Sequence, residues 1–98
     1  MLIKQELFLT VHNCLNGRGF TKTIPVQEPN LNEVVIIEYL NHKKKVGIAW
    51  DGTNDYFIIQ KSYVRRPACS TFLIRLNELN SKEELINDME DILNEWNV

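Results

Sequence analysis

The chain has 98 residues, of which 44% are hydrophobic and 24% are charged, and its formal net charge is −2. This length provides one hydrophobic core, and the composition excludes a disordered protein. The sequence contains no run of about 18 apolar residues, which excludes a membrane-spanning helix.

The N-terminus and the cysteines favour a cytoplasmic location. The first residues, Met-Leu-Ile-Lys-Gln-Glu, lack the basic segment and apolar run of a secretory signal. Cys14 and Cys69 belong to no paired motif, whereas small extracellular domains commonly carry a denser disulfide framework. We therefore expect an unprocessed cytoplasmic chain whose two cysteines are reduced thiols.

The first segment has features of both a helix and a strand. Apolar residues recur between Ile3 and Leu15 with the i, i+4 spacing of a helix, but the region also alternates between apolar and polar residues. The pair Asn16-Gly17 is favoured in the tight turns of β-hairpins. We therefore favour a hairpin, in which Leu9 pairs with Ile24, over an N-terminal helix that ends at Gly17.

Three β-strands are predicted in the middle of the chain, and a fourth follows. Residues 33–40 are rich in β-branched and aromatic side chains and apolar on both faces, which is typical of a central strand. Residues 45–50 and 56–59 follow after turn sequences, so the three segments predict an antiparallel meander. After a looser segment that contains Pro67, residues 71–76 alternate again, with Phe72, Ile74 and Leu76 on one face.

The final segment predicts an amphipathic helix from Ser81 to Trp96. Ser81 and Glu84 have the spacing of a capping box, in which each side chain accepts a hydrogen bond from a backbone N–H at the helix start. The apolar residues that follow form one stripe: Leu85, Met89, Ile92, Leu93 and Trp96. The predicted fold class is α+β, an antiparallel sheet of about five to six strands with this helix packed on one face, in a single domain spanning residues 1–98.

Metal and catalytic chemistry have little support in the sequence. The two histidines, His12 and His42, and the two cysteines show neither the CxxC nor the HxxxH spacing of a zinc site. Gly17-Arg18-Gly19 lacks the longer glycine spacing of phosphate-binding loops. We predict a non-enzymatic protein with no catalytic residues, no metal site and no cofactor.

A basic and aromatic cluster in the middle of the chain supports one functional hypothesis. Pairing of two predicted strands brings positive and aromatic side chains together, as in proteins that bind single-stranded nucleic acid. The residues of this cluster are Lys43, Lys44, Lys45, Trp50, Lys61, Tyr63, Arg65 and Arg66. The alternative, favoured by the negative net charge, is that the aromatic residues fill the core and the lysines protect an edge strand from aggregation.

The C-terminal helix supports a second hypothesis because it concentrates the negative charge. Residues 78–98 contain seven acids and one base, whereas residues 1–77 contain six acids and ten bases. The predicted partner-binding face of the helix consists of Glu84, Asp88, Asp91 and Glu95. Such a row can imitate phosphates and occupy a basic groove. The alternative is a solvated face without a partner, and a solvated face also lacks the desolvated carboxyl group that acid–base catalysis needs.

We therefore expect a small binding protein. The first hypothesis is an inhibitor or regulator of a larger nucleic-acid-handling or host-defence protein, acting through the acidic helix or an exposed sheet edge. Small proteins of phages and mobile elements are of this type, although no motif links the chain to them. The second hypothesis is a nucleic-acid-binding domain that uses the basic cluster. A protein partner is expected and a membrane is not, while a homodimer is compatible with the sequence.

Overall fold

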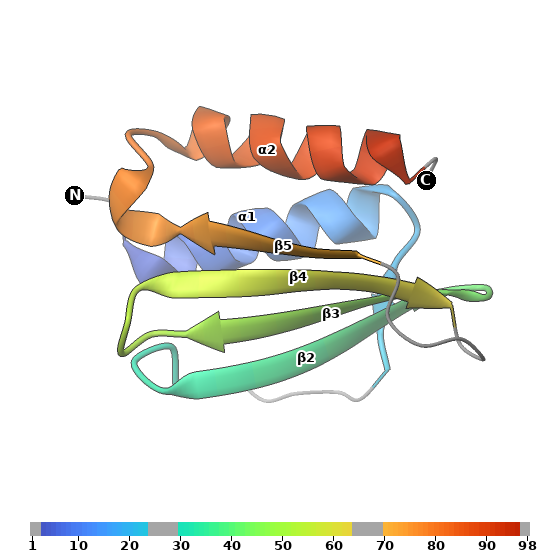
Figure 1. Cartoon of the computed structure of the whole chain (residues 1–98), viewed down its shortest axis with the longest axis horizontal. Coiled ribbons are helices and arrows are strands. Elements are labelled where there is room, and N and C mark those ends of the chain that lie inside the picture. Colours follow the sequence, from blue (N-terminus) through green and yellow to red (C-terminus); the bar gives the residue numbers. More distant parts are fainter. Residues whose placement is uncertain (1–2, 24–29, 64–69, 97–98) are drawn as a thin grey trace.

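A computed structural model shows a five-stranded antiparallel sheet with two helices on one of its faces (Figure 1). The structure describes residues 3–23, 30–63 and 70–96, without the side chain of Tyr63. The strands follow one another across the sheet in chain order, β1-β2-β3-β4-β5. The predicted α+β class and the predicted meander are confirmed, and the structure adds a helix at the N-terminus.

The added helix is α1 (Lys4–Gly17), so the predicted N-terminal hairpin is wrong. Leu7, Val11 and Leu15 are all buried, and only a helix places residues with i, i+4 spacing on one face. Asn16-Gly17 forms the last turn of this helix, and the chain then turns at Gly19, which has a φ of 88°. Ile24, the predicted partner of Leu9, lies outside the described residues.

The sheet is a simple antiparallel meander with a continuous register. Ile37 of β2 pairs with Ile48 of β3, which pairs with Ile59 of β4, and all three side chains are buried. A short 3₁₀ helix, η1 (Leu76–Glu78), follows the last strand. The five strands are β1 (Thr21–Lys22), β2 (Val34–Asn41), β3 (Lys44–Asp51), β4 (Tyr56–Tyr63) and β5 (Ser70–Arg75).

The predicted C-terminal helix is confirmed as α2 (Lys82–Glu95). The Ser81 hydroxyl accepts a hydrogen bond from the backbone N–H of Glu84 at 3.3 Å. The return bond of the capping box differs from the prediction, because the Glu84 carboxylate accepts from the backbone N–H of Asn80 at 3.1 Å. The whole predicted apolar stripe is buried: Leu85, Met89, Ile92, Leu93 and Trp96.

The hydrophobic core lies between the sheet and the two helices. The Trp50 ring has no exposed surface, stacks on Phe57 at a centroid distance of 5.5 Å and meets the edge of Phe8 at 5.8 Å. Its Nε1–H donates to the carbonyl oxygen of Leu31 at 3.1 Å, so the polar atom of the ring is satisfied. Neither helix in the described parts of the chain is long and apolar enough to cross a membrane.

The turn between β3 and β4 is packed against the segment before β2. A Cβ atom added to Gly52 would lie 1.7 Å from the carbonyl oxygen of Leu31, so the two backbones meet closely at this point. The Gly52 N–H donates to the Glu33 carbonyl at 3.0 Å, and the Gly52 carbonyl accepts from Lys4 Nζ at 2.7 Å. This turn therefore joins β3, α1 and the segment before β2 at one end of the sheet.

Candidate interaction surfaces

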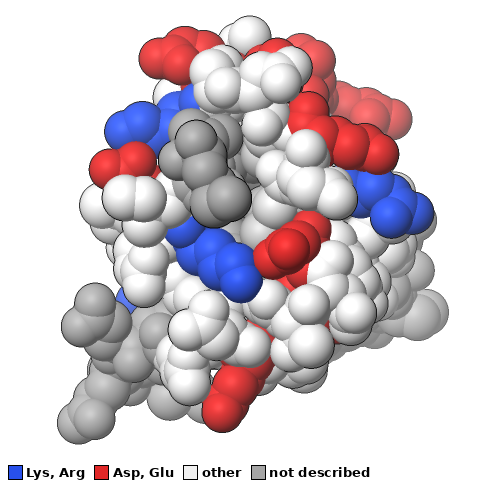
Figure 2. Space-filling view, turned by 90° about the vertical axis from the view of Figure 1, so that its left-hand side faces the viewer, with Lys and Arg blue, Asp and Glu red and all other residues white. Residues whose placement is uncertain are grey.

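The acidic residues predicted to bind a partner lie on the outer face of α2. Glu84, Asp88, Asp91 and Glu95 follow one another at i, i+4, i+7 and i+11, and each is exposed. This spacing places them in one stripe along the helix, which we call the acidic stripe. Figure 2 shows acidic groups along the top of the molecule, over α2.

The members of the acidic stripe have different surroundings. Both Glu84 oxygens accept hydrogen bonds from Asn80, from its backbone N–H at 3.1 Å and from its side chain at 3.2 Å. Within the described chain, no ion pair involves Asp88, Asp91 or Glu95. Glu84 therefore belongs to the helix cap, and the other three carboxylates form the part of the stripe that can meet a partner.

The strand ends of the predicted basic cluster meet as expected. Lys44 and Lys45 of β3 are the Cα partners of Tyr63 and Ser62 of β4. Neighbouring residues of a strand point to opposite faces of the sheet, so Lys44 and Lys45 do not share a surface. The Lys45 Nζ also lies 3.7 Å from a carboxylate oxygen of Glu38. Lys43 is exposed in the turn that precedes β3.

The other members of the basic cluster do not extend the exposed surface of Lys43, Lys44 and Lys45 in the described part of the chain. Trp50 is completely buried, so its ring has no exposed face on which a base can stack. Lys61 is only 4% exposed, and its Nζ lies 5.1 Å from the ring centroid of Phe72 and 5.4 Å from that of Trp96. Arg65 and Arg66 lie outside the described residues, as does the side chain of Tyr63.

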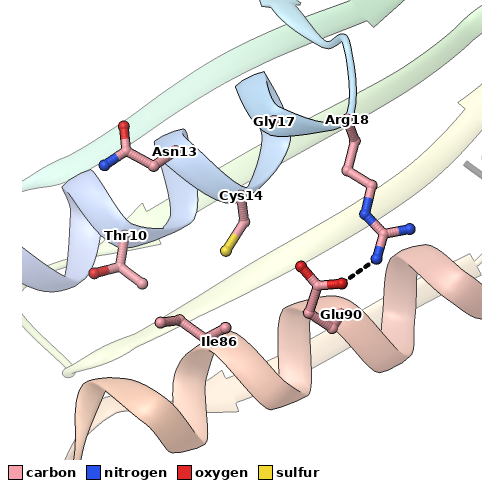
Figure 3. A pocket seen from close by; sticks show the side chains of 7 residues that line it. All are labelled: Thr10, Asn13, Cys14, Gly17, Arg18, Ile86 and Glu90. Atoms are coloured by element: carbon pink, nitrogen blue, oxygen red, sulfur yellow. Dashed lines mark hydrogen bonds and ion pairs between the residues drawn. The ribbon is translucent and has the colours of Figure 1, made fainter.

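A shallow cleft lies between α1 and α2. It was not predicted from the sequence. Its volume is about 370 Å³, and Arg18 and Glu90 form an ion pair at one side of it (Figure 3). Burial, and the nearby Glu90 carboxylate, raise the pKa of the Cys14 thiol in this cleft. The thiol therefore stays protonated at neutral pH, which is not the state of a nucleophilic cysteine. The lining residues are Thr10, Asn13, Cys14, Gly17, Arg18, Ile86 and Glu90.

His12 connects α1 to the sheet. Its Nδ1 lies 2.9 Å from the Tyr39 hydroxyl, and its Nε2 lies 2.8 Å from the side-chain nitrogen of Asn16. Because the side-chain nitrogen of Asn16 can only donate, Nε2 accepts, and Nδ1 carries the proton that it donates to Tyr39. Burial and the positive charge of Lys22 lower the pKa of His12. Within the described residues, no three potential metal ligands lie together.

The opposite face of the sheet carries an exposed apolar row. Ile36, Ala49, Ile58 and Leu73 are successive Cα partners across β2, β3, β4 and β5, so their side chains lie side by side on one face. Ile36 is 72% exposed and Leu73 is 51% exposed, and no described helix or strand covers them (Figure 1). We call this surface the open face.

β2 is buried on one of its two faces. It lies inside the sheet, between β1 and β3, but of its apolar residues only Ile37 and Tyr39, which point toward the helices, are buried. Val34 and Ile36 point the other way and are 62% and 72% exposed. The helices cover one face of the sheet only, and this tertiary arrangement decides which half of the strand is buried.

The charged side chains of the open face balance one another. Glu38 and Lys45, which form an ion pair, lie on one side of the apolar row. Asp51 and Arg75 lie on its other side, in the row that also contains Tyr56. Hydrogen bonds from Asn54 lower the pKa of Asp51, which is therefore charged at neutral pH. Among the described residues of this face, two acids balance two bases, unlike on the outer face of α2.

Comparisons with known proteins give no function for this chain, so a functional argument rests on these surfaces. The chain matches no protein-family model, no curated protein and no solved structure. Two surfaces of different chemistry are available, the acidic stripe of α2 and the neutral, apolar open face.

Proposed function

We propose that this chain is a small non-enzymatic cytoplasmic protein that binds a basic surface of a larger protein through the acidic stripe. The observation that carries the proposal is the environment of Asp88, Asp91 and Glu95, which are exposed, aligned and without an ion-pair partner in the described chain. The apolar residues of the same helix are buried in the core. The helix therefore acts on a partner through charge.

The physical basis is electrostatic complementarity. Like charges three or four residues apart on a helix repel one another, at a cost of about 0.2–0.5 kcal/mol per pair. A basic surface relieves this repulsion and attracts the stripe over a distance of about 8 Å at physiological ionic strength. Proteins that handle nucleic acids carry such basic grooves, so the proposed role is inhibition or regulation of one of them.

Capture of partners with charge-reversal variants tests the proposal. The chain and the triple variant Asp88→Lys, Asp91→Lys, Glu95→Lys are each immobilised and exposed to a lysate of the source cells, with and without nuclease. A control variant reverses Glu6, Glu33 and Glu78, which are exposed and lie outside α2. Both variants have the same net charge. The control also loses the ion pairs of Glu6 with Lys82 and of Glu78 with Arg75, so circular dichroism first establishes that both variants fold.

We expect the unchanged chain and the control variant to capture the same basic protein, which is released by salt. The triple variant of α2 should weaken this binding about tenfold or more in a titration with the purified partner. Equal affinity for the triple variant and the unchanged chain would overturn the proposal. Capture that disappears on nuclease treatment would instead support the nucleic-acid hypothesis.

A further inference from the structure

The open face and the face covered by helices are built from the same strands. The covered face buries Ile37, Ile48 and Ile59, one row of residues along the sheet. On the other side, the row Ile36, Ala49, Ile58 and Leu73 offers a similar set of aliphatic side chains to solvent. Contiguous exposed apolar surface of this kind is typical of an interaction site.

We propose that the open face binds a second copy of this chain and forms a face-to-face dimer. The charges of the open face suit a second copy of the same face. The described strands place two acids and two bases on the open face, so two copies of this described surface can approach each other without net repulsion: Glu38, Asp51, Lys45 and Arg75. A strongly charged partner would find no complementary potential here. This inference is independent of the function proposed for the acidic stripe.

The apolar row is complementary in shape to a second copy of itself. A two-fold axis parallel to the strands and between β3 and β4 places Ile36 opposite the partner's Leu73 and Ala49 opposite the partner's Ile58. The next row then places Gly47 opposite the partner's Gln60. In both rows the small residues of β3 meet larger residues of β4. Stacked sheets interdigitate in this way at a separation of about 10 Å.

The position of the helices leaves the open face free for a second copy. Both helices lie on the covered face, so they point away from the interface when two open faces meet (Figure 1). The two acidic stripes of the dimer then lie on its outer surfaces, where their charges are far apart. Both stripes stay accessible in the dimer.

The size of the open face sets the expected affinity. Four strands about 4.8 Å apart, each contributing about six residues at about 3.3 Å per residue, give a face of roughly 20 by 20 Å. Two such faces cover about 800 Å² together, which is below the roughly 1,000 Å² of a stable specific interface and within the range of weak, transient ones. We therefore expect a reversible dimer with a dissociation constant in the micromolar range.

Sedimentation and light scattering between about 5 and 500 µM test this dimer. The average mass should rise with concentration from 11.5 kDa toward twice that value. It should change little with salt, because the interface is apolar and neutral. A mass that stays at the monomer value over the whole range would overturn the proposal, and so would a dimer that salt dissociates.

Matched substitutions locate the interface. Leu73→Arg and Ile36→Arg should each weaken the dimer about tenfold or more, because each places an unpaired charge in the buried row. Leu9→Arg is the control: Leu9 lies on α1 and is 55% exposed, close to the 51% of Leu73. Circular dichroism establishes that all three variants fold. A dimer weakened by Leu73→Arg alone indicates pairing along the edge strand β5, and would overturn the face-to-face arrangement.

A contact between Ile36 and Leu73 is the sharpest sign of the dimer. Within one chain these residues are three strands apart, about 14 Å, which is too far for a nuclear Overhauser effect between their methyl groups. In the dimer they lie opposite each other. A sample that mixes differently labelled chains should therefore show this effect between chains, and its absence in a solution shown to be dimeric would exclude the proposed axis.

Discussion

The two faces of the sheet differ in burial although both carry aliphatic side chains. Ile48, on the covered face of β3, is 1% exposed, whereas Ile36, on the open face of β2, is 72% exposed. Each residue is a β-branched aliphatic in a strand, and neither its identity nor its local pattern distinguishes the two. The difference teaches that the helices, and not the strands, decide where the core of this protein lies.

The largest expected effect is a difference in stability between substitutions on the two faces. Ile48→Ala should lower the free energy of unfolding by about 2–5 kcal/mol, because it leaves a cavity in the core. Ile36→Ala removes the same atoms from a solvated site and should change the stability of the monomer by less than about 0.5 kcal/mol. Urea denaturation at low protein concentration measures both, and similar losses would mean that the open face is buried in the monomer.

The second prediction compares two glycines, Gly47 in β3 and Gly52 in the turn that follows it. Gly52→Ala should cost about 1–3 kcal/mol, since the added Cβ collides with the Leu31 backbone and the contact can be relieved only by moving the chain. Gly47, on the open face, has no atom within 4 Å of an added Cβ. Gly47→Ala should therefore stabilise the fold by about 0.4–1 kcal/mol through the unfolded state. Thermal unfolding of the two variants gives the sign of each effect.

The third prediction concerns the start of α2. Ser81→Ala removes the acceptor of the Glu84 N–H and should cost about 1 kcal/mol. Asn87→Ala is the control, because Asn87 is exposed in the middle of α2 and alanine is the better helix former. If both variants melt at the temperature of the unchanged chain, the cap contributes nothing to the docking of α2.

The smallest effect is a pH dependence at the contact between α1 and the sheet. His12 has a folded pKa below its ordinary 6.5, so the unfolded chain takes up its proton first as the pH falls. The contribution of neutral His12 is therefore complete above pH 6.5 and is lost as the pH falls through the folded pKa. His12→Gln should remove this part of the pH dependence. Melting temperatures between about pH 5 and 8 test it, and an unchanged profile would assign the dependence to other groups.

The elements with local signals could be predicted from the sequence. The last helix has a capping residue and an apolar stripe at helical spacing, and the structure contains both. The meander of residues 33–59 has β-branched residues between short turns, and its strands have the expected pairing. The prediction for the N-terminal segment was wrong because Asn16-Gly17 suits a hairpin turn and the end of a helix equally well. The helical spacing of the apolar residues between Ile3 and Leu15 was also visible in the sequence.

The candidate surfaces divide in the same way. The acidic stripe depends only on the period of the helix and on the burial of its opposite side, so its four residues could be named from the sequence. The basic cluster depends on which face of the sheet the helices cover, and this arrangement takes Trp50 and Lys61 out of solvent. The open face depends on the same arrangement and was not predicted at all.

The sequence by itself determined the class of the fold, the C-terminal helix with its cap, and the direction in which the acidic stripe points. These features follow from interactions between residues that are close in the chain. Only the tertiary structure decided that residues 4–17 form a second helix, that both helices cover the same face, and that the other face of the sheet is open. Strands with aliphatic residues on both sides can be covered from either side, and the packing of distant segments makes that choice.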